Sequence, residues 1–256
     1  NEKLYFKNGC AILLKIGHVE IQTDYELPQG RDVCKFYNPR VSYVNGKWIL
    51  SFAMEVEKQD YALKDCSVGV DLGIKDLAVV SCEGDKMVFP NINKTRKVKR
   101  LNRHLKHAQR LAARKTKGSK NRLKAYEKCK RLYARLASIR HDYTHKTTTK
   151  IADLLPSRIV VEDLNVRWMM KNRHLARAVA EQNFYKFRAQ LEYKCEERGI
   201  ELVVANRFFP SSKKCSACGA IHKGLKLKDR IFNCPHCGMS IDRDFNAALN
   251  LENYVA

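Results

Sequence analysis

Two closely spaced pairs of cysteines constrain this chain more than any other feature of its sequence. Cys215 and Cys218 form one C-x-x-C pair, Cys234 and Cys237 form another, and 15 residues separate the pairs. This spacing is typical of a zinc ribbon, in which four thiolates complete the tetrahedral shell of a structural Zn²⁺ ion. We therefore predict a ribbon over residues 215–238.

The residues around the cysteine pairs support this interpretation. Gly219 and Gly238 each follow the second cysteine of a pair, where a zinc knuckle turns back and a positive φ is needed. His222 and His236 are not needed to complete the shell, and an Fe–S cluster is the alternative to zinc. The other cysteines are scattered singly, as reduced thiols of an intracellular protein would be. They are Cys10, Cys34, Cys66, Cys82, Cys129 and Cys195.

The charge of the chain is concentrated in one segment. The 49 basic and 27 acidic residues give a formal net charge of +22, which points to a polyanionic partner. Residues 93–150 hold 21 Lys and Arg against two acids, Glu127 and Asp142, and so contribute +19. Leu101 and Leu105 begin an apolar helical spacing there, and Lys117-Gly118-Ser119 marks a turn. We predict a helical hairpin with a wide cationic face.

Three acidic positions predict a second metal site. Asp71 ends the apolar run Val68-Gly69-Val70, and Glu162 ends Ile159-Val160-Val161. A third acid, Asp242 or Asp244, opens the last helix. Strand-end acids fall along one edge of an α/β sheet, and carboxylates that converge there suit Mg²⁺ or Mn²⁺. Each acid alone has another interpretation, a helix N-cap for the third and a salt bridge for Glu162.

The remaining sequence predicts a β-rich region followed by an α/β domain. Residues 1–63 favour a small barrel or sandwich. Its predicted strands are Leu4–Phe6, Cys10–Ile16, Val19–Thr23, Val41–Val44 and Lys47–Val56. The predicted strands of the α/β sheet are Val68–Asp71, Leu77–Ser81, Met87–Phe89, Ser157–Val161 and Glu201–Ala205. The predicted helices are Arg173–Arg198, closed by Gly199, and Asp244–Asn253.

The order of these motifs resembles that of the TnpB family of transposon-encoded nucleases, to which compact type V CRISPR effectors are related. The resemblance covers roughly residues 40–252, and its last block is the most specific. The motifs are VGVDLGIKDLAVVS (68–81), IVVEDLN (159–165), RFFPSSKKCSACG (207–219), CPHCG (234–238) and DRDFNAALNL (242–251).

The resemblance implies an RNase H-like (RuvC) domain with a mixed sheet and a catalytic triad of Asp71, Glu162 and Asp244. Asp244 is preferred to Asp242 because the family's acid precedes x-Asn-Ala-Ala. The implied cofactors are structural Zn²⁺, catalytic Mg²⁺ or Mn²⁺ and a guide RNA, and the implied partner is target DNA. The implied domains are a wedge-like, guide-contacting β region (1–63), RuvC (64–214) with the basic hairpin 93–150, the ribbon (215–238) and a RuvC C-terminal segment (239–256).

The predicted function is therefore RNA-guided DNA cleavage in the prokaryotic cytoplasm, near the nucleoid. Lys and Arg would contact phosphates, while guide pairing would choose the sequence. Candidate contacts are Arg100, Arg103, Arg110, Arg207, Lys213 and Lys214. Phe208, Phe209 and Tyr185 are candidates for base stacking, but core packing is the expected role of each. No apolar run is long enough for a membrane span. The chain starts at Asn1 in strand-like sequence, and we expect that it begins inside a longer protein.

Other functions remain open at this point. A guided repressor without nuclease activity would share the fold but should have lost part of the triad. A RuvC-type resolvase or transposase would need no guide. An actin-like ATPase also has a V-G-V-D-L-G loop, but Ile74 and Lys75 stand where hydroxyl residues are usual. A zinc-bearing adaptor would leave Asp71 and Glu162 unexplained.

Overall fold

The computed structural model describes residues 4–23, 25–29, 35–44, 46–55, 59–226 and 228–255. The chain divides into two compact units, Asn1–Lys58 and Gln59–Ala256. Three residues named in the sequence analysis, Asn1, Cys34 and Val56, lie outside the described residues.

The first unit consists of two antiparallel sheets around an aromatic core. Its strands are β1 (Leu4–Lys7), β2 (Cys10–Leu13), β3 (Gly17–Glu20), β4 (Phe36–Val44) and β5 (Lys47–Met54). One sheet has the order β1-β2-β3, and the other pairs β4 with β5. The rings of Phe6, Phe36 and Phe52 lie 5.2–5.4 Å apart, so both sheets contribute to one core. The five predicted strands are confirmed, and closure into a barrel stays a prediction.

A mixed five-stranded sheet forms the centre of the second unit. Its strands are β6 (Lys64–Leu72), β7 (Asp76–Cys82), β8 (Asp85–Pro90), β9 (Pro156–Glu162) and β10 (Glu201–Ala205). The order is β10-β9-β6-β7-β8, with β6, β9 and β10 parallel and β7 and β8 antiparallel to their neighbours. All five strands agree with the prediction. Parallel pairing brings the C-terminal ends of β6 and β9 to the same edge.

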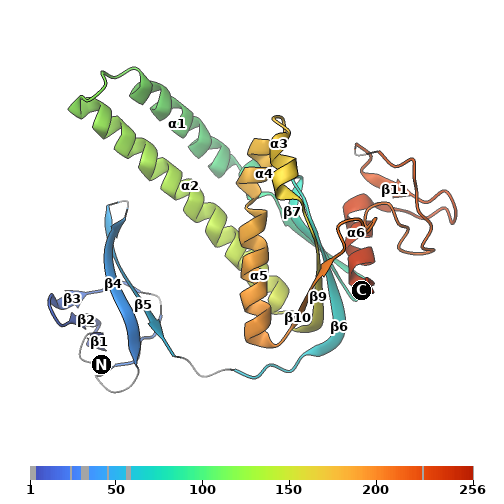
Figure 1. The fold of residues 1–256 in the computed structure, drawn as a ribbon, viewed down its shortest axis with the longest axis horizontal. Coiled ribbons are helices and arrows are strands. Elements are labelled where there is room, and N and C mark those ends of the chain that lie inside the picture. The colour runs from blue at the N-terminus through green and yellow to red at the C-terminus, as the bar shows by residue number, and fades with distance from the viewer. Residues whose placement is uncertain are drawn as a thin grey trace. The chain divides into compact units, whose positions relative to one another are not determined.

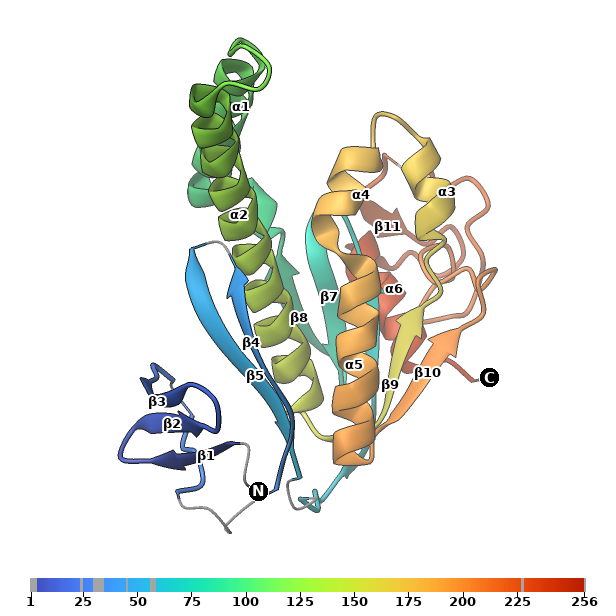
Figure 2. The same ribbon diagram turned by 60° about the vertical axis from the view of Figure 1, so that its left-hand side comes forward.

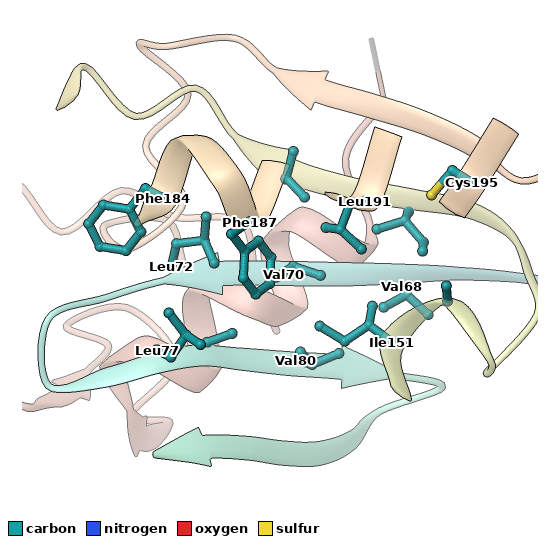
Figure 3. Packing of buried hydrophobic residues seen from close by; sticks show 14 of the residues in the cluster. Val68, Val70, Leu72, Leu77, Val80, Ile151, Phe184, Phe187, Leu191 and Cys195 are labelled. Carbon is teal, nitrogen blue, oxygen red and sulfur yellow. The ribbon is translucent and has the colours of Figure 1, made fainter. Parts of the chain in front are cut away.

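Helices cover both faces of this sheet. The helices of the second unit are α1 (Arg96–Ala113), α2 (Lys120–Ala152), α3 (Val166–Lys171), α4 (Ala176–Gln182), α5 (Phe184–Arg198) and α6 (Arg243–Glu252). Figure 3 shows Phe187 and Leu191 of α5 and Ile151 of α2 packed on Val70 and its neighbours. Helix α6 covers the opposite face, where Leu251 is buried against Val160.

The alternation of side chains in β6 and β9 decides which residues face α6. Val68, Val70 and Leu72 pack in the core with α5, so Gly69 and Asp71 point to the α6 side. A Cβ at Gly69 would lie 2.0 Å from the carbonyl oxygen of Ala248, and therefore only glycine permits this close approach of α6. The same alternation in β9 places Glu162 on the α6 side.

The basic segment forms the predicted hairpin (Figure 1). Helices α1 and α2 pack through an apolar stripe that includes Leu101, Leu105 and Leu136, all buried. Gly118 has a φ of 83°, and Ser119 caps α2 by accepting a hydrogen bond from the backbone N–H of Arg122. Among the described helices, none combines the length and apolar content that crossing a membrane requires.

The predicted single helix over Arg173–Arg198 is wrong. Asn183 adopts a left-handed conformation with a φ of 55° and separates α4 from α5. The side chain of Gln182 is buried and donates to the carbonyl oxygen of Gly73 at 2.8 Å, a tertiary contact that anchors the end of α4. The predicted end of the helix at Gly199, with a φ of 74°, is confirmed. The short helix α3 was not predicted.

Candidate active site and cysteine ribbon

Three carboxylates converge on the α6 face of the sheet. Asp71 comes from β6, Glu162 from the end of β9 and Asp244 from the first turn of α6. The side chains of Asp71 and Glu162 share a hydrogen bond, and Asp244 is near enough to act on both through its charge. The structure thus brings together the acids that the sequence analysis selected.

The electrostatics of this cluster are unfavourable without a cation. Burial raises the pKa of Asp71 well above its ordinary value, and the charges of Glu162 and Asp244 raise it further. Burial also raises the pKa of Glu162, although hydrogen bonds with Ser211 and Asp71 act in the opposite direction. The positive charge of Arg243 lowers both pKa values. Carboxylate oxygens are the donors that a hard divalent cation prefers, although these three side chains do not all come within 4.8 Å of one another as the ribbon sulfurs do.

The structure separates the roles of Asp242 and Asp244. Asp242 is the N-cap of α6, where its side chain accepts a hydrogen bond from the backbone N–H of Phe245 at 3.0 Å. Burial raises its pKa, but that hydrogen bond and the charges of Lys86 and Lys75 outweigh burial and leave the pKa below its ordinary value. The N-cap interpretation thus holds for Asp242, while Asp244 belongs to the acidic cluster.

The ribbon brings its four cysteines into one group. The sulfur atoms of Cys215, Cys218, Cys234 and Cys237 all lie within 4.8 Å of one another. Those of Cys215 and Cys237 are 3.7 Å apart, and those of Cys218 and Cys234 are 3.6 Å apart. Four ligands at about 2.3 Å around a tetrahedral Zn²⁺ ion would be separated by about 3.8 Å. The sulfur positions therefore fit zinc and are too far apart for disulfides.

Each cysteine pair lies on a similar turn. The backbone N–H of Gly219 donates to the carbonyl oxygen of Cys215, and that of Gly238 donates to Cys234. Both glycines have positive φ, 75° and 73°, as predicted. In addition, the backbone N–H of Cys237 donates to the sulfur of Cys234, and this is the largest cause that lowers the pKa of Cys234 to about 6. The pKa values of Cys218 and Cys237 are raised instead, so the zinc interpretation rests on the sulfur distances.

Two asparagines of α6 connect the ribbon to the acidic cluster. The buried side chain of Asn246 accepts from the backbone N–H of Ser216 at 3.0 Å and donates to the carbonyl oxygen of Lys214 at 2.7 Å. The buried side chain of Asn250 donates to the carbonyl oxygens of Ser211 and Lys214. The hydroxyl of Ser211 donates to the carboxylate of Glu162. Helix α6 therefore fixes both the first knuckle and a residue that holds Glu162.

These positioning residues were not singled out in the sequence. Asn246 and Asn250 lie in the DRDFNAALNL block, and two buried amides one helical turn apart were the available signal. Ser211 offered no signal of its own, because it lies in a loop whose course depends on the tertiary fold.

The predicted nucleic-acid contacts lie in two places. Arg100, Arg103 and Arg110 are exposed on α1. Arg207 lies beside Glu162 at the edge of the sheet and pairs with Asp163 at 2.5 Å. Lys213 and Lys214 lie in the loop before the ribbon. Lys213 is exposed, whereas the ammonium of Lys214 lies over the ring of Phe209 at 5.7 Å.

The expectation that three aromatic residues pack in the core is wrong for two of them. Tyr185 and Phe208 are 80% and 88% exposed. Tyr185 lies in the first turn of α5, between the buried Phe184 and Phe187. Phe208 lies in the loop after β10. Only Phe209 packs, with its ring 4.9 Å from that of Tyr254.

Comparison with known proteins shows which families the chain resembles. Residues 51–173 match the OrfB_IS605 model, described as "Probable transposase", and residues 184–251 match the "Cas12f1-like, TNB domain" model. A Streptomyces pristinaespiralis protein named "Putative RNA-guided DNA endonuclease" is 37% identical over 96% of this chain and 59% of its own length. The InsQ protein of Escherichia coli, with the same description, is 33% identical over 97% of this chain and 63% of its own length. The chain is thus similar to the TnpB family along most of its length.

The chain is also similar to proteins of lower sequence identity. The TnpB-like protein L79 of Acanthamoeba polyphaga mimivirus is 26% identical over 80% of this chain and 40% of its own length. A cryo-EM structure of a CRISPR-Cas12f ternary complex has the same fold, with a TM-score of 0.56 and 23% identity over 80% of this chain and 42% of that one. This chain thus spans about three fifths of the length of the relatives from Streptomyces pristinaespiralis and Escherichia coli.

Each of the two matched segments contains part of the candidate site. The first matched segment contains Asp71 and Glu162, and the second contains Asp244 and the ribbon cysteines. The three carboxylates therefore come from both matched segments, and the sheet and α6 bring them together.

Proposed function

We propose that this chain is the catalytic part of an RNA-guided DNA endonuclease that hydrolyses phosphodiester bonds of target DNA. The convergence of Asp71, Glu162 and Asp244 at one edge of the sheet carries the proposal. The names of the relatives in Streptomyces and Escherichia coli describe RNA-guided DNA endonucleases, and this supports the same activity here.

In this proposal Asp71, Glu162 and Asp244 are catalytic residues that would hold Mg²⁺ or Mn²⁺. Such ions, when bound, activate water and stabilise the leaving 3′-oxygen of a phosphodiester. The residues around the triad keep its carboxylates in place. Ser211 holds Glu162 by a hydrogen bond, and Arg243 lies 3.8 Å from the carboxylate of Asp244.

The basic hairpin supports a nucleic-acid substrate. A groove of about 700 Å³ at the base of α1 is lined by many cations and one acid. Its charged residues are Lys94, Arg96, Lys99, Arg103, Lys106, Arg177 and Glu181. The apolar stripe of α1 faces α2, so the cations are on the outside. We propose that they contact phosphates and give affinity without reading sequence.

The proposal extends to the sheet, the cysteine ribbon and the β-rich region. The mixed sheet is of the RuvC type, and the cysteine ribbon holds structural Zn²⁺. The β-rich region 1–63 is a wedge-like barrel that contacts guide RNA. The solved complex of a Cas12f1 protein with sgRNA and target DNA, which has a TM-score of 0.54 to this chain, supports a guide RNA and a DNA target as partners.

The test compares two neighbouring acids in the full-length protein loaded with its guide RNA. Asp244→Asn should abolish magnesium-dependent cleavage of target DNA and leave binding intact. Asp242→Asn is the matched control, because Asn also caps helices well and this carboxylate lies outside the triad. Target binding without cleavage by the unsubstituted protein would favour a guided repressor. Cleavage without any RNA would favour a resolvase or transposase.

A further inference from the structure

Two residues with exposed aromatic rings line the cavities that Glu162 also lines. Trp168 of α3 is 71% exposed and Tyr185 of α5 is 80% exposed. Figure 2 shows β9 leading into α3, with α4 and α5 beside it. Exposed aromatics that are scattered singly are ordinary, but two beside one catalytic carboxylate are not.

The cavity of Tyr185, about 270 Å³ in volume, has an apolar floor and a cationic rim. Its floor consists of Leu72, Val161, Leu164, Val166, Phe184 and Phe187. Its rim consists of Arg167, Arg188 and Arg207. An apolar floor suits the flat face of a nucleobase, and a cationic rim suits the phosphate attached to it.

The cavity of Trp168, about 230 Å³ in volume, adjoins the first. The two share Glu162, Leu164, Asn165 and Arg207 as lining residues. Asp163 lines the second cavity and pairs with Arg207 at 2.5 Å and with Arg188 at 3.7 Å, which holds both guanidinium groups at this edge. Among the described residues, no acid forms a salt bridge with Arg167.

We propose that Trp168 and Tyr185 form two stacking subsites for consecutive unpaired bases of the DNA strand that is cut. Neighbouring bases would occupy the two cavities, and the phosphate between them would lie over Glu162 and Arg207. Paired bases are stacked inside a duplex and cannot enter, so the site selects single-stranded DNA. The inference rests on the proposed nuclease function and adds the groups that position its substrate.

The test uses the full-length protein with its guide RNA. The DNA strand carries 2-aminopurine next to the cleaved bond, and the fluorescence of this base falls when it stacks. Trp168→Ala and Tyr185→Ala should each abolish the fluorescence change and weaken strand binding and cleavage by about 5- to 100-fold. Trp168→Phe and Tyr185→Phe should retain most of both. Tyr193→Ala is the matched control, because Tyr193 lies in α5 but lines neither cavity.

The outcomes separate this inference from the proposed function. If the unsubstituted protein never cleaves DNA but its fluorescence change depends on both rings, the nuclease proposal fails and the stacking subsites stand. If both Ala variants bind and cleave like the unsubstituted protein, the subsites are refuted. If the binding of guide RNA depends on the two rings but the binding of the DNA strand does not, the stacking subsites are refuted as well.

Discussion

The carboxyl groups of Asp71 and Glu162 share a hydrogen bond, although they come from different strands of the sheet. Two carboxyl groups can share such a bond only if one keeps its proton, and the raised pKa of Asp71 is consistent with this. The protein therefore holds acids together at a cost in stability that a bound cation would relieve.

We expect Asp71→Asn to stabilise the magnesium-free protein while it abolishes cleavage. The pKa of Asp71 is raised in the folded state, so the folded chain holds this proton more tightly than the unfolded chain does, and stability falls as pH rises from near 3.8 through the folded pKa. At about pH 8 the variant should melt about 3–5 °C higher. The difference should shrink as pH falls, and thermal melts at several pH values measure it. A variant that melts lower at high pH would contradict this account.

We expect Ser211→Ala to weaken magnesium binding without unfolding the protein. The hydrogen bond from Ser211 lowers the pKa of Glu162, so its loss should raise that pKa and make the carboxylate a poorer ligand. Loss of a group that holds a metal ligand typically costs about 10- to 100-fold in affinity or activity. Cleavage measured against magnesium concentration should shift by that factor. Ser216→Ala is the control, because only the backbone N–H of Ser216 bonds to Asn246.

We expect Gly69→Ala to destabilise the fold strongly. The added Cβ would lie 2.0 Å from the carbonyl oxygen of Ala248 and 2.3 Å from the backbone nitrogen of Glu252, and a backbone cannot move aside as a side chain can. Helix α6 should be displaced, at a cost of about 3 kcal/mol or more. Urea unfolding measures the change. Gly224→Ala serves as the control, since its Cβ would meet only the side chain of His222 at 3.2 Å. Equal stabilities would refute the close packing of α6.

Local patterns in the sequence were sufficient to predict the strands of the first unit and of the five-stranded sheet, and to select the acids and cysteines that the fold brings near one another. The apolar alternation through Val70 and the acid at Asp71 fixes the face on which that acid lies, because successive residues of a strand point to opposite sides. The spacing of the ribbon cysteines is also a local signal. The glycine that follows each cysteine pair, Gly219 or Gly238, is a local signal as well, and it predicted the two positive φ angles.

Features that depend on tertiary contacts could not be predicted. The break at Asn183 accompanies the anchoring of Gln182 on Gly73, a residue far away in the sequence. Helical spacing alone suggests one continuous helix there. Tyr185 comes soon after that break and is exposed, whereas core packing was expected of it. Ser211 likewise bonds to Glu162 from a loop that Asn250, far away in the sequence, also contacts.

We expect the ribbon to require one zinc ion per chain, and its loss to impair cleavage. Cys218→Ser should lower the measured zinc content and expose the ribbon to protease, since four-thiolate sites are structural. Because Asn246 joins the first knuckle to α6, cleavage should fall as well. Cys129→Ser is the control, as Cys129 is buried in the α1–α2 hairpin away from the ribbon. Full zinc content in the Cys218 variant would contradict the ligand assignment.

We expect the cations of α1 to control how strongly salt weakens DNA binding. Each phosphate contact on duplex DNA adds about −0.9 to the slope of log K against log salt. Arg103→Ala and Lys106→Ala, which line the basic groove, should each make the slope less steep by about 0.9 if the residue contacts one phosphate. The measurement is a binding isotherm at several salt concentrations on DNA of unrelated sequences, which should be affected alike. Lys130→Ala is the matched control, because Glu127 already pairs with Lys130 at 2.8 Å. A slope that stays the same in both groove variants would mean that this groove does not contact phosphates.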